Sequence, residues 1–160
     1  GTPARFPSVS GKIELYSTTL ERFGHDPLPD WRDPFETPPD LGGEFPLILV
    51  SGPRTQAYIN SQFRQLPSVA RKMPRPRAEI HPENASRAGV TDGAQVAVIS
   101  PHGRVVFEAA VTRRVHPGCV VIPAGWSDAN ANLLTHDSRL DPVTGFPDFR
   151  SSVCRIEPVT

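Results

Sequence analysis

The sequence has 160 residues with 17 basic and 17 acidic side chains, so the chain has no net charge to attract nucleic acid or an anionic membrane. Nineteen prolines, about twice the usual share, favour short strands and fixed loops over long helices. No apolar run reaches about 18 residues, which excludes a transmembrane helix from the sequence, and no signal peptide is recognisable.

The first part, residues 1–44, is interpreted as an entry segment. The sequence opens without a methionine, and we expect it to be part of a longer polypeptide. KIELYS predicts a short strand, and TTLERFG predicts one or two helical turns that end at Gly24. The proline-rich stretch DPLPDWRDPFETPPDLGG is expected to run extended, with Trp31 and Phe35 as its anchors on another surface.

The remaining residues, 45–160, contain most of the strand signals. FPLILVSG, AEIHP, CVVIPAG and SSVCRIEPV predict single strands, and ENASRAG predicts a compact helix that begins at Pro82 and ends at Gly89. Apolar residues alternate on both sides of Pro101–His102–Gly103, which predicts a β-hairpin. Six or seven short strands with two or three short helices favour a closed barrel or a sandwich over a layered α/β fold.

A long polar stretch, GWSDANANLLTHDSRLDPVTGFPDF, follows the strand CVVIPAG. Connections of this length in a compact domain tend to be functional or disordered. The chain's five histidines have no paired metal spacing and are interpreted as loop or surface residues. Cys119 and Cys154 lie in strand-like runs without a CxxC motif, and we interpret them as small buried apolar residues, with a disulfide as the alternative.

One stretch has a distinctive order of elements, AEIHPENASRAGVTDGAQVAVISPHGRVVFEAAVTRRVHPGCVVIPAGW. It resembles the C-terminal molybdopterin-dinucleotide-binding domain of the dimethyl-sulfoxide-reductase family of molybdenum and tungsten oxidoreductases. SGKIELYS, LVSGPRTQAYINSQF and NANLLTHDSRLDPVTGFPDFRSSVCRIEPV extend the resemblance over nearly the whole chain. The resemblance implies a mainly β fold, a six-stranded double-psi β-barrel of the aspartate-decarboxylase type over residues 45–160. Residues 1–44 are then a lead-in strap from upstream catalytic domains.

The resemblance also implies a function for the domain. It would bind and position a bis(molybdopterin guanine dinucleotide) cofactor with molybdenum or tungsten, and the cofactor would carry the chemistry. The metal's protein ligand and any iron–sulfur cluster would belong to the upstream region, since no four-cysteine pattern occurs here. The isolated chain is therefore predicted to be inactive. The expected partners are the upstream domains of the same polypeptide and an electron-transfer subunit, without nucleic acid or membrane insertion. The compartment is left open, with the cytoplasm favoured over the periplasm.

Two loops contain the candidate ligand residues. Pterin and guanine edges alternate donors and acceptors, which suits amides and hydroxyls, while phosphates suit arginine and the free N–H groups of glycine turns. The family pattern assigns a pterin contact to Asn132, and Asn130 is a second candidate or the cap of the short helix NLLT. Positions 124–126 would lie near the substrate funnel, and they depart from relatives with bulkier or charged residues there, so the substrate stays open. The predicted cofactor-binding residues are Ser51, Gly52, Arg54, Thr55, Gln56, Tyr58, Asn60, Ser61, Trp126, Asn130, Asn132 and Arg150, and none is predicted to be catalytic or to bind metal.

Other interpretations remain for some of these features. Trp126 is either a ligand residue or a packing residue. The basic run Arg71, Lys72, Arg75 and Arg77 is interpreted as a solvated or interdomain face, with phosphate contact as the alternative. None of the twelve glycines precedes a serine, so the pyruvoyl chemistry of self-processing double-psi barrels has no starting material. A stand-alone double-psi-barrel protein-interaction module is the alternative function, although such a module does not need the asparagine-rich loop.

Overall fold

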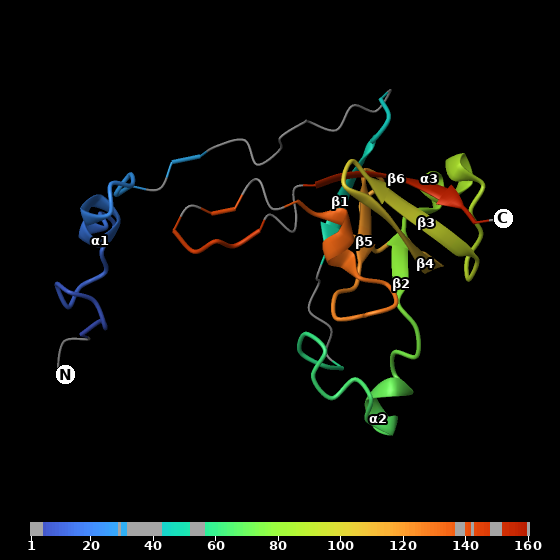
Figure 1. Cartoon of the computed structure of the whole chain (residues 1–160), viewed down its shortest axis with the longest axis horizontal. Coiled ribbons are helices and arrows are strands. Elements are labelled where there is room, and N and C mark those ends of the chain that lie inside the picture. Colours follow the sequence, from blue (N-terminus) through green and yellow to red (C-terminus); the bar gives the residue numbers. More distant parts are fainter. Residues whose placement is uncertain are drawn as a thin grey trace. The chain divides into compact units, whose positions relative to one another are not determined.

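The computed structural model describes residues 5–28, 30–31, 43–51, 57–136, 140–141, 143–147 and 152–159 (Figure 1). The chain divides into two compact units, Gly1–Pro34 and Phe35–Thr160. The predicted boundary, between residues 44 and 45, differs from this division, and the intervening residues 35–42 lie outside the described part of the chain.

The first unit contains one short helix, α1, over Thr18–Arg22. Its N-terminus is capped by Ser17, whose hydroxyl accepts a hydrogen bond from the Leu20 N–H at 3.2 Å. The helix predicted from TTLERFG is thus confirmed, but the strand predicted from KIELYS is wrong, because residues 12–17 have no regular secondary structure. An isolated strand has no neighbour for its backbone hydrogen bonds, so alternation alone does not form one.

The second unit is a closed barrel of six strands. Around the barrel the strands follow the order β1, β5, β2, β4, β3, β6. The strands are β1 Leu47–Ser51, β2 Arg77–Ile80, β3 Gln95–Ser100, β4 Gly103–Val111, β5 Cys119–Ile122 and β6 Ser152–Pro158. The predicted strands and the predicted hairpin of this unit are confirmed, and the fold is the mainly β, six-stranded double-psi barrel that the family resemblance implies.

Two parallel strand pairs determine where the loops lie. β1 runs parallel to β5, with Ser51 opposite Ile122, and β2 runs parallel to β4, with Ile80 opposite Val111. The other pairs around the barrel are antiparallel. Because parallel strands end at the same edge, Ser51 at the end of β1 and Ile122 at the end of β5 lie side by side.

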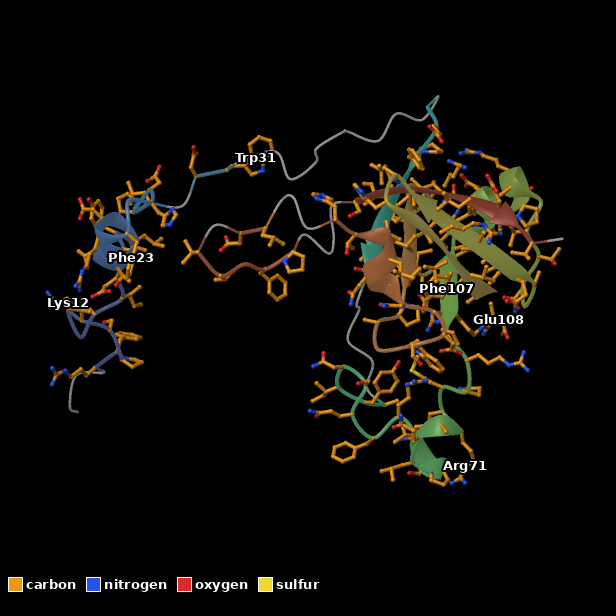
Figure 2. The ribbon with its side chains drawn as sticks, viewed as in Figure 1. Lys12, Phe23, Trp31, Arg71, Phe107 and Glu108 are labelled. Atoms are coloured by element: carbon orange, nitrogen blue, oxygen red, sulfur yellow. The ribbon has the colours of Figure 1, made fainter. Side chains whose placement is uncertain are left out.

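Alternate residues of the strands fill the barrel. Along β4, Val105, Phe107 and Ala109 are buried while their neighbours are not, and Phe107 is the largest fully buried side chain (Figure 2). Leu49, Ile80, Val96, Val98, Val120 and Ile122 meet it from other strands. This interior is close-packed and apolar, so the barrel forms a rigid support for the loops at its edge.

Three short helices connect the strands. α2 covers Pro67–Ala70, α3 covers Pro82–Ala88, and a 3₁₀ helix, η1, covers Ala131–Leu134. α3 ends as predicted at Gly89, which takes the left-handed conformation with φ of 67°. α2 has no buried residue, and it lies before the start of β2, away from the barrel (Figure 1). Among the described helices, none has both the length and the apolar character needed to cross a bilayer.

The two cysteines are free thiols. Cys154 on β6 is fully buried and Cys119 on β5 is partly buried. Burial raises the pKa of both thiols above the ordinary value, strongly for Cys154, where the neighbouring Cys119 adds to the effect. The interpretation as buried apolar residues is confirmed for Cys154, and the alternative disulfide is not formed.

Candidate functional site

The two predicted ligand loops meet at the edge where β1 and β5 end. We name residues 57–66 the first loop and residues 123–135 the second loop. The register of the parallel pair brings the ends of β1 and β5 to the same level. Five of the predicted ligand residues, Gly52, Arg54, Thr55, Gln56 and Arg150, lie outside the described residues. The other seven are described, and Ser51 is buried as the last residue of β1.

Tyr58 and Trp126 join the two loops through their side chains. The Trp126 indole Nε1 donates a hydrogen bond to the Tyr58 hydroxyl at 2.9 Å, and that hydroxyl donates to the Ala124 carbonyl oxygen at 3.5 Å. Each residue is only 7% exposed. The polar atoms of this pair therefore satisfy each other, which supports the packing interpretation of Trp126. Direct contact of either side chain with a cofactor stays a prediction.

The backbones of the two loops also touch. Gly125 has φ of 85°, a conformation that residues with a Cβ rarely adopt. A Cβ at this position would collide with the carbonyl oxygen of Asn60, which itself has φ of 54°. The contact requires glycine, and it fixes the spacing between the loops. The side chains of Asn60 and Ser61, the neighbouring candidates, are exposed.

Arg64 of the first loop lies over Trp126 of the second. Its guanidinium carbon is 4.0 Å from the centre of the indole ring, within cation–π range. The side chain is half-buried, and its Nε is buried without a hydrogen-bond partner. No described carboxylate pairs with this guanidinium. The loop junction thus contains a positive charge that the described part of the chain leaves uncompensated.

The two asparagines of the second loop have different roles. The amide oxygen of Asn130 accepts a hydrogen bond from the Asn132 N–H at 3.1 Å and so caps η1, as the alternative interpretation of Asn130 proposes. Asn132 is exposed, and its carbonyl oxygen accepts from the Thr135 hydroxyl at 3.1 Å. Within the described chain its side-chain amide makes no hydrogen bond. Asn132 is therefore the asparagine whose donors and acceptor are available to a ligand.

Apolar residues and the β3–β4 hairpin hold the second loop in place. Trp126, Ala129, Ala131 and Leu134 belong to the core cluster, and Leu134 is fully buried. A Cβ on Gly103 would collide with the Leu133 carbonyl oxygen, so the hairpin packs directly on η1. The His102 and His136 rings lie 4.7 Å apart between their centres, where the hairpin turn meets the residues after η1.

A cavity of about 990 Å³ lies beside the loops. This volume is within the range of small-molecule and cofactor sites. One side consists of the first loop and the end of β5, with Tyr58, Ile59, Asn60, Ile122, Pro123 and Ala124. The lining also includes the charged residues Lys72, Arg75, Arg77, Arg114, Glu79 and Glu108.

Two of the four cations in the basic run that leads into β2 are paired with carboxylates. Arg75 and Arg77 both pair with Glu108, at 3.1 and 3.0 Å, and Arg77 also pairs with Asp92 at 3.2 Å. Arg71 and Lys72 are exposed, and Figure 2 shows Arg71 at α2, away from the barrel. This arrangement agrees with the interpretation as a solvated or interdomain face. The unpaired Arg64 was missed by sequence reasoning because it lies outside that run, and its proximity to Trp126 depends on the barrel closing.

The described residues contain no group of three or more histidine, cysteine or acidic side chains arranged to hold a metal ion. The described loops present a side-chain amide, a guanidinium and backbone groups, which can bind a ligand.

Comparison with known proteins identifies the family of this domain. The family model for the molydopterin dinucleotide binding domain matches residues 47–153, which include both loops and all six strands at least in part. The chain belongs to this domain family of the dimethyl-sulfoxide-reductase-type enzymes. The stand-alone interaction module is therefore not favoured.

Individual relatives agree with the family assignment. The chain is 33% identical to acetylene hydratase from Syntrophotalea acetylenica over 166 residues, covering 90% of this chain and 23% of the relative. It is 34% identical to trimethylamine-N-oxide reductase from Haemophilus influenzae over 137 residues, covering 80% of this chain and 15% of the relative. The solved structure of acetylene hydratase from Pelobacter acetylenicus superposes with a TM-score of 0.83 at 29% identity over 98% of this chain and 24% of that structure. The chain thus spans about a quarter or less of the length of these relatives.

Described residues of the two loops fit a pterin dinucleotide. The free amide of Asn132 suits a heterocycle edge, and the unpartnered Nε and uncompensated charge of Arg64 suit an anion. The close approach at Gly125 shows that the two loops form one surface.

Proposed function

We propose that this chain is the C-terminal domain of a molybdopterin oxidoreductase and that its two loops hold the pterin end of a guanine dinucleotide cofactor. In a bis(molybdopterin guanine dinucleotide) cofactor, molybdenum or tungsten supplies the redox chemistry when the cofactor is bound. The chain's own contribution is to bind and orient the cofactor and to exclude water from it. An iron–sulfur cluster, the metal's protein ligand and the contact to an electron-transfer subunit are assigned to the remainder of the polypeptide.

The observation that supports this proposal best is the difference between the two asparagines. Asn130 uses its amide oxygen within the loop, whereas Asn132 presents an unused amide at the surface of the same 3₁₀ helix. An amide both donates and accepts, which is what the alternating edge of a pterin requires. The loop is fixed by buried residues on either side of Asn132, so the amide is held in place before a ligand binds.

Two alanine substitutions test the proposal. In the complete polypeptide, Asn132→Ala should weaken cofactor binding by about 1–3 kcal/mol, because a heterocycle edge loses its partner in a closed site. Asn130→Ala should instead lower the stability of the domain by about 1 kcal/mol, because η1 loses its cap. The measurements are the metal and nucleotide content of the purified protein and the melting temperature of the 160-residue chain.

The two variants serve as controls for each other, since they are two residues apart in one helix. The proposal expects Asn132→Ala to lose cofactor and keep its melting temperature. If Asn132→Ala lowers the melting temperature while the polypeptide keeps its full cofactor content, the residue is structural and the proposal fails.

A further inference from the structure

Arg155 is the other half-buried arginine described in the barrel unit, and it provides an internal comparison for Arg64. Among the described arginines only Arg64 and Arg155 are half-buried. Both guanidinium groups lie over an aromatic ring, Arg64 at 4.0 Å from the centre of Trp126 and Arg155 at 5.2 Å from that of Phe45. Arg155 also pairs with Glu44 at 2.8 Å and with Glu157 at 2.9 Å. Arg64 has no such partner in the described chain.

An unpaired, half-buried positive charge is energetically unfavourable unless an anionic ligand pairs with it. Partial burial removes water from the guanidinium, and the indole face replaces only part of the lost interaction. The Nε of Arg64 is fully buried and has no hydrogen-bond partner among the described residues. The planar group has five donors in a fixed geometry that matches carboxylate and phosphate oxygens. The guanidinium of Arg64 is therefore suited to bind an oxyanion.

The surroundings of Arg64 indicate which anion. The guanidinium lies at the junction of the two loops, where Tyr58 and Trp126 are hydrogen bonded and Gly125 touches Asn60. The ligand class of this domain family is a pterin dinucleotide, whose anionic groups are phosphates. Of the basic side chains that line the cavity, Arg75, Arg77 and Arg114 are paired with carboxylates, and Lys72 is exposed, so water solvates its charge.

We propose that Arg64 binds a phosphate oxygen of the dinucleotide, with the Trp126 indole as the platform that holds its guanidinium in place. This inference rests on the proposed function and adds a phosphate contact that the sequence pattern does not assign. Tyr58 and Trp126 act here as positioning residues, since their own polar atoms are engaged with each other.

Fluorescence of Trp126 tests the inference in the 160-residue chain with inorganic pyrophosphate as the probe. Trp31 is 79% exposed, so Trp31→Phe leaves Trp126 as the single tryptophan without disturbing the barrel. Pyrophosphate that pairs with Arg64 should change the indole emission. Arg64→Gln should raise the apparent Kd for pyrophosphate about tenfold or more, the loss expected for one charge-assisted contact.

Three comparisons make the result specific. Arg87→Gln removes an exposed arginine on α3 and should leave the response intact. Arg64→Lys keeps the charge without the planar group, so it should retain a weakened response, and it replaces Arg64→Gln as the test if that variant does not fold. Malonate at matched ionic strength tests whether the natural partner of Arg64 is a carboxylate from elsewhere in the polypeptide. Malonate should give a weaker response than pyrophosphate.

The inference is overturned if the parent protein does not respond to pyrophosphate, if Arg64→Gln responds as the parent does, or if malonate binds as well as pyrophosphate. Measuring the nucleotide content of the complete polypeptide distinguishes a failure of this inference from a failure of the proposed function. If Asn132→Ala loses nucleotide and Arg64→Gln does not, the cofactor binds this domain but its phosphates lie elsewhere.

Discussion

Asn132 and Trp126 are both predicted to bind the cofactor, but their polar groups differ in the structure. Both are predicted ligand residues, and only Asn132 presents an unused polar group. The indole N–H of Trp126 is taken by Tyr58 across the loop junction. A sequence pattern shows which residue types are near a ligand, but it does not show which polar atoms are already satisfied. That information comes from contacts between residues far apart in the chain.

At the residue scale, the buried thiol of Cys154 should make the free energy of unfolding depend on pH. Because burial raises the pKa of its thiol, the folded chain keeps a proton that the unfolded chain loses above about pH 8.5. The unfolded state then binds fewer protons, so the free energy of unfolding should fall as pH rises, by up to about 1.4 kcal/mol per pH unit per thiol. Below that pH both states are protonated and the thiol adds no slope.

Urea unfolding under reducing conditions, repeated at several pH values on either side of the thiol pKa, measures this slope. Cys154→Ala should reduce the slope while leaving the weaker contribution of Cys119, whose thiol pKa is also raised by burial. An unchanged slope in the variant would mean that the buried thiol is not responsible.

At the scale of elements, the second loop is more firmly anchored than its sequence indicates. Its polar composition suggests a segment outside the core, but Trp126, Ala129, Ala131 and Leu134 are buried at the end of the barrel. These apolar residues have neither helical nor strand periodicity, so no pattern reveals them. The helix α3 and the β3–β4 hairpin, by contrast, have local signals in Pro82, Gly89 and the turn at 101–103, and they form as predicted.

The contact between Gly125 and Asn60 leads to a prediction about the loop junction. Gly125→Ala has to overcome both the left-handed backbone conformation and a collision with the Asn60 carbonyl oxygen. Gly93→Ala has a similar φ, 79°, with nothing within 4 Å, so it is the matched control for the backbone term alone. We expect Gly125→Ala to destabilise the chain by about 1 kcal/mol or more beyond Gly93→Ala, the typical cost of overpacking.

Equilibrium unfolding of the two variants measures the difference. In the complete polypeptide, Gly125→Ala should also lose cofactor while Gly93→Ala keeps it, because only the first forces the loops apart. Equal stabilities for the two variants would show that the loops are not held together at this point.

At the scale of the whole molecule, the barrel converts distant segments into one binding surface. The sequence predicts the strands because apolar residues alternate or run together, and the family resemblance predicts that they close. The residues alone do not predict that β1 pairs in parallel with β5. That pairing brings the two loops together. The junction of Tyr58, Arg64 and Trp126 follows from that pairing, so its chemistry becomes visible only when the barrel is closed.

The central claim is that the two loops form a single cofactor-binding surface, and amide hydrogen exchange tests it most directly. The complete polypeptide is compared with and without its cofactor, with the β3 and β4 arms of the hairpin as the internal reference. We expect residues 57–66 and 123–135 to gain protection together on cofactor binding, while the hairpin arms exchange at the same rate in both forms. If both loops exchange equally fast with and without a bound cofactor, they do not form the cofactor-binding surface.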